Sequence, residues 1–237
     1  MEAKTAPYYD KIYAALGKDY AAESERLKGI VKQHKRSRGK ALLDVACGTG
    51  AHAEHLCKAF GITGLDIEPA MVTIAQERCP TGVFFIGDMR EFDLDRSFDV
   101  VTCLFSSIGF MKTVEDLRAA TGEMARHLVP GGVLLIEPWL APDTFSAGHM
   151  QVVVVDEEEL KLARVTRSDR DGDLSILDMQ YLIATAEGIE HVAERYEMGL
   201  FEREEYGAAL EEAGLDVVYD RQGPAERGLF IATKALD

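Results

Sequence analysis

Residues 41–137 alternate between short apolar runs and longer segments in which apolar positions recur at helical spacing. The first pattern is typical of strands and the second of helices. Helices are predicted over 51–60, 69–78 and 113–128, and strands over 41–45, 62–66, 83–87, 98–105 and 133–137. Strands and helices that alternate in this way predict a doubly wound parallel sheet. The continuous apolar run FDVVTCLF indicates a strand that is covered on both faces.

The two ends of the chain extend this sheet. Apolar residues at helical spacing predict two helices within 8–34, broken near Gly17 and followed by a basic linker, HKRSRGK. Near the C-terminus, a predicted helix over 203–213 precedes strands over 215–220 and 228–234. The seven residues between those strands are too few for a crossover helix, so the strands must pair antiparallel. The sheet is therefore expected to have five parallel strands and a terminal antiparallel hairpin.

Residues between the fifth strand and the last helix break the alternation. Four runs with strand character are separated by turn-like segments such as SDRDGD and AEGIE. They predict a small antiparallel sheet in meander order, whose exposed edges would favour association. The chain is thus expected to consist of N-terminal helices (1–40), a core (41–142 and 201–237) and an inserted sheet (143–200) that acts as a lid or a dimer platform.

Charge and composition exclude several classes of function. The 237 residues include 26 basic and 41 acidic side chains, a formal net charge of −15. Such a chain lacks the basic surface that binds nucleic acid or an anionic membrane. It has no apolar run near the roughly 20 residues of a membrane helix and no signal-peptide core. Its four cysteines form no CxxC pair, which predicts reduced thiols, a cytoplasmic location and no metal site.

The sequence DVACGTG joins the first predicted strand of the sheet to its first helix. Gly48 and Gly50 allow a tight turn and a close approach of the backbone to a ligand. Asp66 ends the next strand, where a carboxylate can accept hydrogen bonds from ribose hydroxyls. Asp88 follows the third strand and could accept from an adenine amine, with Met89 against the ring. A helix N-cap is the alternative role for either acid.

These motifs resemble those of class I S-adenosylmethionine-dependent methyltransferases, through DVACGTG, GLD and GDMR. The blocks GKDYAAE, FSSIG, HLVPGG, EPW and RGLF are similar to the N,N-dimethyltransferases of macrolide amino sugars. The resemblance implies the α/β, Rossmann-like class I methyltransferase fold. It also implies S-adenosyl-L-methionine as cofactor, S-adenosyl-L-homocysteine as product, and N-methylation of a thymidine diphosphate-linked deoxyamino sugar in antibiotic biosynthesis.

The resemblance and the motif positions together nominate two sets of site residues. The expected cofactor contacts are Tyr20, Ala46, Cys47, Gly48, Gly50, Asp66, Ile67, Met71, Asp88, Met89 and Phe105. The expected substrate contacts are Tyr9, Phe110, Glu137, Trp139 and Arg227. For Arg227 we expect a bidentate contact to the diphosphate, with a surface ion pair, for example with Glu226, as the alternative.

No catalytic base is assigned from the sequence. Some members of the resembled family have histidine after SSIG, but this chain has Phe110, which excludes a histidine base at that position. Methyl transfer to an amine is an in-line displacement that depends mainly on positioning. O-methylation of another small metabolite, or cofactor binding without catalysis, are the alternative functions. The missing third glycine of GxGxxG argues against a nicotinamide enzyme. Asp93, Asp95 and Asp99 are expected to form a solvated acidic loop.

Overall fold

The fold contains two separate sheets, and the computed structural model describes residues 4–224 and 227–236. The larger sheet has seven strands in the order β10-β11-β5-β4-β1-β2-β3. Its strands are β1 (Ala41–Val45), β2 (Gly61–Asp66), β3 (Val83–Ile86), β4 (Phe98–Cys103), β5 (Leu128–Ile136), β10 (Leu215–Asp220) and β11 (Leu229–Lys234). β11 runs antiparallel to both β5 and β10, whereas β1 to β5 are parallel. The predicted fold class, including the terminal hairpin, is confirmed.

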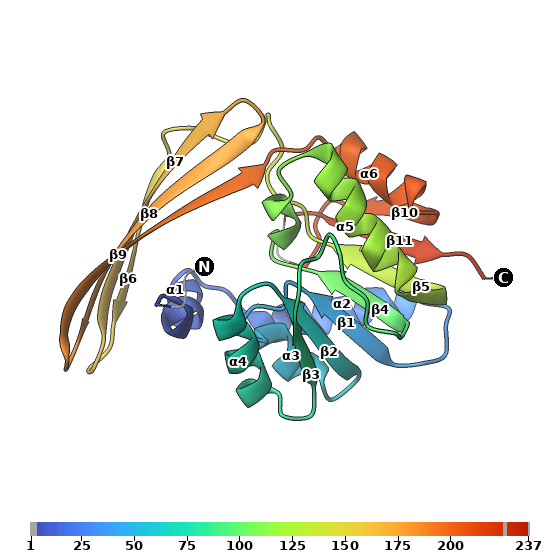
Figure 1. The fold of residues 1–237 in the computed structure, drawn as a ribbon, viewed down its shortest axis with the longest axis horizontal. Helices are drawn as coiled ribbons and strands as arrows, with labels where there is room; N and C mark the ends of the chain where they lie inside the picture. Colours follow the sequence, from blue (N-terminus) through green and yellow to red (C-terminus); the bar gives the residue numbers. More distant parts are fainter. Residues whose placement is uncertain (1–3, 225–226, 237) are drawn as a thin grey trace.

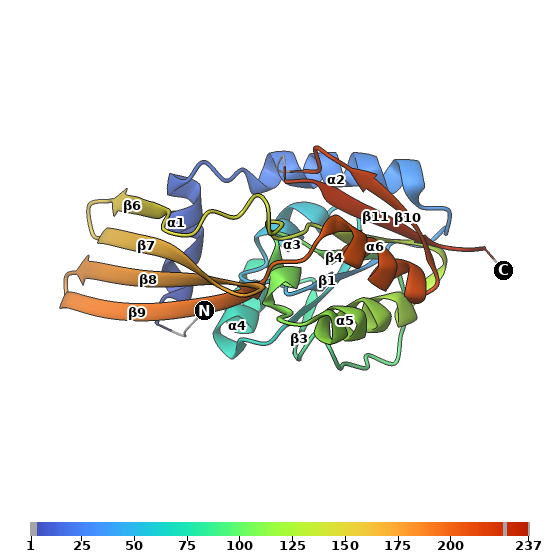
Figure 2. The ribbon, with the colours of Figure 1, turned by 90° about the horizontal axis from the view of Figure 1, so that it is seen from above.

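Helices cover both faces of the large sheet (Figures 1 and 2). The helices of the core are α3 (Ala51–Leu56), α4 (Pro69–Arg78), α5 (Val114–Arg126) and α6 (Arg203–Glu212). α5 and α6 bury Leu117, Met124 and Leu210 in one apolar cluster with the strands. On the opposite face, Leu27 and Leu56 belong to a second cluster. Two independent apolar layers therefore fix the strand ends that face the site.

Two N-terminal helices, α1 (Tyr9–Ala15) and α2 (Tyr20–His34), follow a short 3₁₀ turn, η1 (Ala6–Tyr8). They are separated near Gly17, whose φ of 81° lies in the left-handed region, as the sequence indicated. Asp19 caps α2 by accepting a hydrogen bond from the N–H of Ala22 at 2.9 Å. α2 packs on the core, whereas α1 turns away to the inserted sheet (Figure 1).

The inserted sheet is a four-stranded antiparallel meander that extends away from the core (Figure 1). Its strands are β6 (Met150–Asp156), β7 (Lys161–Asp171), β8 (Leu174–Thr185) and β9 (Gly188–Gly199). The inner face packs on α1, where Ile12 joins Leu162, Tyr181 and Ile183 in a third apolar cluster. Since α1 also contacts the core through Asp10 and Tyr13, it is one of the contacts between the core and the inserted sheet.

β5 begins at Leu128, earlier than the predicted strand over 133–137, because residues 129–132 form a bulge inside the strand. Phe98 pairs with Leu128, but Val100 already pairs with Val133, so the residues between them leave the ladder. The carbonyl of Gly131 in this bulge accepts hydrogen bonds from the N–H groups of Arg36 and Ser37. The basic linker is therefore anchored to the core.

The expectation of a solvated loop is wrong for Asp99. Its side chain is buried and accepts hydrogen bonds from Ser37 Oγ at 2.7 Å and from the N–H of Ala41 at 3.0 Å. Asp93 and Asp95 are exposed, as expected. Asp99 thus joins the end of the linker to the start of β1. Within the described residues, no helix combines the length and apolar character needed to cross a bilayer.

Candidate active site

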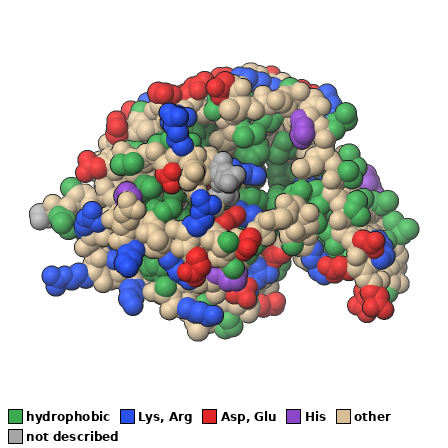
Figure 3. Space-filling model, turned by 180° about the vertical axis from the view of Figure 1, so that it is seen from behind, with side chains coloured by type: hydrophobic (Ala, Val, Ile, Leu, Met, Phe, Trp, Pro, Cys, Tyr) green, Lys and Arg blue, Asp and Glu red, His purple; other side chains and the backbone are tan. Residues whose placement is uncertain are grey.

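One large cavity, of about 1460 Å³, lies between the core and the inserted sheet. Figure 3 shows the molecular surface hollowed between these two parts, with hydrophobic side chains gathered in the hollow. The cavity extends from the carboxyl ends of β1, β2 and β4 to the inner face of β7, β8 and β9. Small-molecule pockets usually hold roughly 300–1,000 Å³. This one has room for two ligands side by side. A second cavity of about 40 Å³ adjoins the glycine loop.

The glycine loop presents its backbone to both cavities. Ala46, Gly48 and Gly50 all have φ between 54° and 72°, in the left-handed region. Ala46 and Gly48 line both cavities, and Cys47 lines the smaller one. Gly50 lines neither. It precedes α3, and a Cβ there would come within 3.0 Å of Ala75 in α4, so the close packing of the two helices favours glycine at this position.

Two backbone N–H groups hold the Asp66 side chain at the cavity. Its Oδ2 accepts a hydrogen bond from Gly48 N–H at 2.8 Å, and its Oδ1 accepts one from Glu68 N–H at 3.0 Å. Burial raises the pKa of Asp66, and these two bonds act against that rise. Each carboxylate oxygen keeps a further lone pair, so the group can still accept from a ligand diol.

Asp88, Met89 and Ile67 form an adjoining part of the wall. Asp88 is paired with Arg90, whose Nη2 lies 2.6 Å from Oδ2, and this pairing lowers the pKa of Asp88. Met89 is buried, whereas 59% of Ile67 is exposed. An ionised acid beside two apolar side chains offers both a hydrogen-bond acceptor and a surface for a flat ring.

Phe105 and Ser106 form a strained turn at the end of β4. Their φ angles are 53° and 61°, a conformation that bulky residues rarely adopt. The carboxylate of Glu137 accepts a hydrogen bond from Phe105 N–H at 2.8 Å, and Ser106 Oγ donates to the carbonyl of Pro138 at 2.7 Å. These bonds from the chain after β5 hold the turn and aim the Phe105 ring at the cavity.

The structure places Glu137 beneath the cavity wall rather than on it. The residue is fully buried and lines neither cavity. Burial raises the pKa of Glu137, and the nearby cations Lys18 and Arg227 oppose that rise. Its Oε1 has no hydrogen-bond partner among the described residues. Glu137 is therefore not placed to make the direct substrate contact that the sequence predicted. Its hydrogen bond to Phe105 gives it a role in positioning the turn after β4.

Two cations pack against the Phe105 ring. Lys18 Nζ lies 3.8 Å from the ring centroid and pairs with Glu23, which also contacts His52 Nε2 at 2.9 Å. The guanidinium carbon of Arg227 lies 5.4 Å from the same centroid. Its Nη1 is 3.5 Å from Ser106 Oγ, at the limit of a hydrogen bond. Glu226, the alternative partner of Arg227, lies outside the described residues.

The N-terminal helices cover this part of the cavity. Tyr13 packs edge-on against Phe105 with 4.7 Å between ring centroids, and Tyr9 packs on Tyr13 at 4.6 Å. Asp10 accepts a hydrogen bond from Thr49 of the glycine loop at 2.8 Å and pairs with Arg78 of α4. α1 is thereby fastened directly over the loop that the sequence assigned to the cofactor.

Tyr20 lies at the smaller cavity, close to the glycine loop. Its ring packs edge-on against His52 with 4.9 Å between centroids. Its hydroxyl is buried and has no hydrogen-bond partner among the described residues. A buried hydroxyl of this kind is costly unless a ligand or water completes it. The expected contact with a polar end of the cofactor therefore fits Tyr20.

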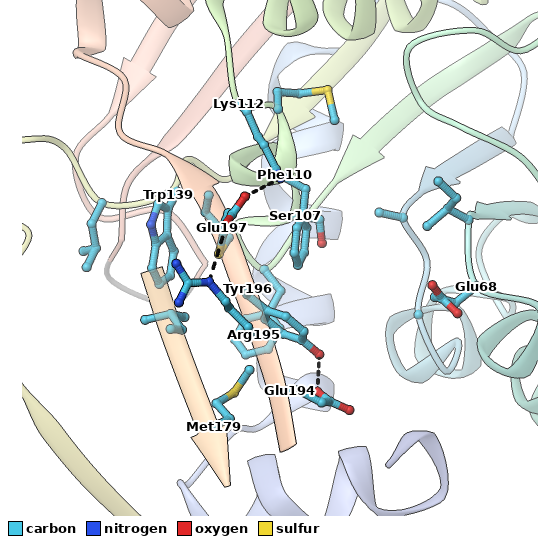
Figure 4. A pocket seen from close by; sticks show the side chains of 18 of the residues that line it. Glu68, Ser107, Phe110, Lys112, Trp139, Met179, Glu194, Arg195, Tyr196 and Glu197 are labelled. Carbon is cyan, nitrogen blue, oxygen red and sulfur yellow. Dashed lines mark hydrogen bonds and ion pairs between the residues drawn. The ribbon is translucent and has the colours of Figure 1, made fainter. Parts of the chain in front are cut away.

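Aromatic side chains form the cavity wall where the core meets the inserted sheet (Figure 4). Phe110 packs edge-on against Tyr196 at 5.5 Å, and Trp139 Nε1 donates to Ser175 Oγ at 2.9 Å. In Figure 4, Glu68 lies across the cavity from this group. Trp139 and Phe110 are thus placed at the cavity, between the core and the inserted sheet.

The inserted sheet adds cavity residues that the sequence did not nominate. They include Arg164 and Thr166 on β7, Leu177 and Met179 on β8, and Glu194 and Tyr196 on β9. A faint signal exists in β7, because Arg164 falls at an inward position two residues after the buried Leu162. Fourteen of the sixteen nominated residues line a cavity, the exceptions being Gly50 and Glu137. Their individual roles remain predictions.

The fold, the glycine loop and the acids after β2 and β3 define a class I S-adenosylmethionine-dependent methyltransferase. Residues 42–132 match the family model of a methyltransferase domain. The chain is 42% identical over 236 residues to the dTDP-3-amino-3,4,6-trideoxy-alpha-D-glucopyranose N,N-dimethyltransferase of Streptomyces venezuelae, covering 99% of each protein. It belongs to the family of dTDP-amino-sugar N,N-dimethyltransferases.

Two solved structures agree with this assignment. DesVI of Streptomyces venezuelae has a TM-score of 0.92 and 41% identity, with coverage of 99% of this chain and 100% of DesVI. CalS10 of Micromonospora echinaspora, an amino pentose methyltransferase solved with S-adenosylmethionine, has a TM-score of 0.86 and 39% identity over 96% of each chain. The enzyme is a methyltransferase that uses S-adenosylmethionine.

The residues present fit this cofactor. Asp66 offers acceptors for a ribose diol, and Asp88 with Met89 offers an acceptor beside an apolar surface. The Tyr20 hydroxyl, which has no partner among the described residues, and the left-handed backbone at Ala46 and Gly48 would hold the remaining polar end. When bound, the cofactor supplies an electrophilic methyl group on a sulfonium.

We expect Asp66→Ala to weaken S-adenosylmethionine binding by about 1–3 kcal/mol, because hydrogen bonds to a charged group are lost. Isothermal titration calorimetry measures the change. Asp173→Ala is the matched control, since that carboxylate is 91% exposed on a turn of the inserted sheet. Unchanged affinity of the Asp66 variant would refute the assignment.

We expect Glu137→Ala to lower the free energy of unfolding by about 1–3 kcal/mol, because the buried N–H of Phe105 loses its acceptor. Glu137→Gln keeps an acceptor oxygen and should lose less. Urea unfolding of both variants measures the difference. Equal losses would show that the negative charge, rather than the hydrogen bond to the turn, is what matters.

Proposed function

We propose that the enzyme N-methylates a deoxyamino sugar that is linked to a nucleoside diphosphate. The name of the Streptomyces venezuelae relative specifies a dTDP-amino sugar, and CalS10 is described as involved in calicheamicin biosynthesis. The observation that carries the proposal is the continuity of one cavity. It joins the cofactor acids Asp66 and Asp88 to the aromatic wall at Trp139 and to the cation Arg227. An amino sugar with an attached diphosphate would match this order of acidic, aromatic and cationic groups along the cavity.

In this reaction the protein contributes by orienting the reacting groups and by excluding water from the site. An amine nucleophile displaces a neutral leaving group, so no acid is needed, and an aliphatic amine is partly deprotonated near neutral pH. The aromatic faces of Phe110, Tyr196 and Trp139 restrict where the sugar can lie. Tyr9 and Tyr13 on α1 cover the site against water. Orientation and exclusion of water can supply most of the acceleration.

Turnover with defined nucleotide sugars tests the function. The enzyme is incubated with S-adenosylmethionine and either a dTDP-amino sugar or the corresponding hydroxy sugar, and products are analysed by mass spectrometry. One or two added methyl groups on the amino sugar, with matching release of S-adenosylhomocysteine, is the expected result. Methylation of the hydroxy sugar alone would favour O-methylation. Cofactor binding without turnover of any substrate would favour a non-catalytic role.

We expect Arg227→Ala to raise the KM for the nucleotide sugar by about 10- to 100-fold, because a charge-assisted phosphate contact is lost. Cofactor affinity should stay level, and Arg227→Lys should recover only part of the loss. Arg221→Ala, an exposed arginine in the same loop, is the control. An unchanged KM for every accepted nucleotide sugar would contradict the phosphate role and weaken the proposed substrate class.

We also propose a homodimer through the inserted sheet. Its outer face exposes apolar side chains, namely Met150, Val152, Val154, Val165, Leu182 and Ile189. An exposed apolar face of this kind is unusual on a monomer. We expect light scattering to give a dimer mass for the native enzyme and a monomer mass for Leu182→Glu. A native monomer would overturn this proposal. The cytoplasmic location expected from the sequence also remains a prediction.

A further inference from the structure

Glu194 is a buried carboxylate at the cavity wall, and hydroxyl groups from three residues surround it. It lies on β9, and only 5% of it is exposed. Its Oε2 accepts a hydrogen bond from the hydroxyl of Tyr196 at 2.8 Å, and the hydroxyl of Tyr181 lies 3.3 Å from the same oxygen. Its Oε1 accepts from Thr5 Oγ1. A group that can only accept, held by donors on both oxygens, is fixed in position on the inserted sheet.

The hydrogen bond to Glu194 determines what Tyr196 can offer to a ligand. A phenol carries one proton, and Tyr196 donates it to the carboxylate (Figure 4). Burial raises the pKa of Tyr196 and the charge of Glu194 raises it further, so the phenol stays protonated near neutral pH. Donation to an anion also strengthens the phenol oxygen as an acceptor. Tyr196 therefore presents only an acceptor to the cavity, and this selects a ligand group that carries an N–H or an O–H.

Tyr196 lies between the aromatic wall and the helix that covers the glycine loop. Its ring packs edge-on against Phe110 with 5.5 Å between centroids. Tyr9 of α1 is a neighbour as well, because Tyr196 is one of the groups that raise the pKa of Tyr9. Tyr9 lines both cavities, including the smaller one beside the glycine loop. The Tyr196 oxygen is therefore placed in the region where a sugar amine would meet the methyl group of the cofactor.

We propose that Tyr196 accepts a hydrogen bond from the amine of the substrate, and that Glu194 is the positioning residue that keeps the Tyr196 proton away from that amine. The inference rests on the proposed function. The attacking nitrogen uses its only lone pair to form the bond to the methyl carbon, so a phenol that donated to this lone pair would hinder the attack. Because Tyr196 can only accept, it holds an N–H of the amine and leaves the lone pair free for the in-line displacement.

The same contact distinguishes the substrate amines from the final product. A neutral primary amine has two N–H groups and the monomethylated amine has one, so the Tyr196 oxygen can hold both. The neutral dimethylated amine has no N–H and loses the contact. An acceptor at this position therefore supports two successive methylations and favours release of the dimethylated sugar.

Calorimetry on the enzyme saturated with S-adenosylhomocysteine tests the contact without turnover. The ligands are a dTDP-amino sugar and its deoxy analogue, which has hydrogen in place of the amine. We expect Tyr196→Phe to weaken binding of the amino sugar by about 2- to 10-fold and to leave the deoxy analogue unchanged, because one hydrogen bond to the amine is lost. Tyr181→Phe is the matched control and should change neither affinity. The Tyr181 hydroxyl approaches the same Glu194 oxygen, but Tyr181 is fully buried and lines neither cavity.

Turnover of the dTDP-amino sugar tests the role of Glu194. We expect Tyr196→Phe and Glu194→Gln each to lower kcat by about 10- to 100-fold and to leave S-adenosylmethionine affinity unchanged, because the amine is no longer oriented. If Glu194 acts through Tyr196, the double variant should lose no more than Tyr196→Phe alone. Glu190→Gln controls for the loss of a charge from β9, since Glu190 is exposed on the same strand and pairs with Lys4.

Three outcomes would overturn the proposal: amino-sugar affinity that Tyr196→Phe leaves unchanged, equal effects of Tyr196→Phe and Tyr181→Phe, or fully additive losses of kcat in the double variant. S-adenosylhomocysteine affinity reports whether each variant is folded. If Glu194→Gln does not fold, the comparison of Tyr196→Phe with Tyr181→Phe decides the matter. If the native enzyme methylates no amino sugar, the proposed function fails. If it does so and Tyr196→Phe has no effect, only this inference fails.

Discussion

The hydrogen bond from Phe105 N–H to the carboxylate of Glu137 is the contact on which the geometry of the site depends. β4 could not end in two left-handed, non-glycine residues without outside support, because that conformation is costly. The support comes from the end of the neighbouring parallel strand, β5, where Glu137 and Pro138 both accept hydrogen bonds. Since the two strands are fixed by the central sheet, the direction of the Phe105 ring is fixed too.

The Phe105 ring in turn joins parts of the chain that are far apart in sequence. Tyr13 of the N-terminal helix, Lys18 of the helix junction and Arg227 of the terminal hairpin all pack against it. Each of these contacts brings a segment outside the parallel strands to the carboxyl edge of the sheet, where ligands bind in folds of this class. The fully buried carboxylate of Glu137 thereby determines how the cavity wall around Phe105 is arranged, although Glu137 itself does not line the cavity.

The sequence predicted those features that depend on local pattern. Strand β1 and helix α4 have the predicted bounds, and Asp66 ends β2 and Asp88 follows β3 as expected. Contacts between segments that are far apart in the chain could not be predicted from the sequence. Nothing in EPW tells a buried Glu137 from one at the cavity, and the acidic run around Asp99 resembles a solvated loop. Gly50 fits the motif equally well as a ligand contact or as a packing glycine, and only the approach of Ala75 distinguishes them.

The charges along the cavity show why burial carries more information than composition. Most cations at the cavity have a carboxylate partner in the described chain, for example Arg90 with Asp88 and Lys112 with Glu197. Those pairs are partly exposed, and surface pairs contribute little energy. Arg164 differs because only 4% of it is exposed, so its charge is less screened by solvent than the charges of those pairs. A net charge of −15 says only that acidic side chains outnumber basic ones. Burial therefore distinguishes Arg164 from the paired surface cations, which a count of charges over the whole chain cannot do.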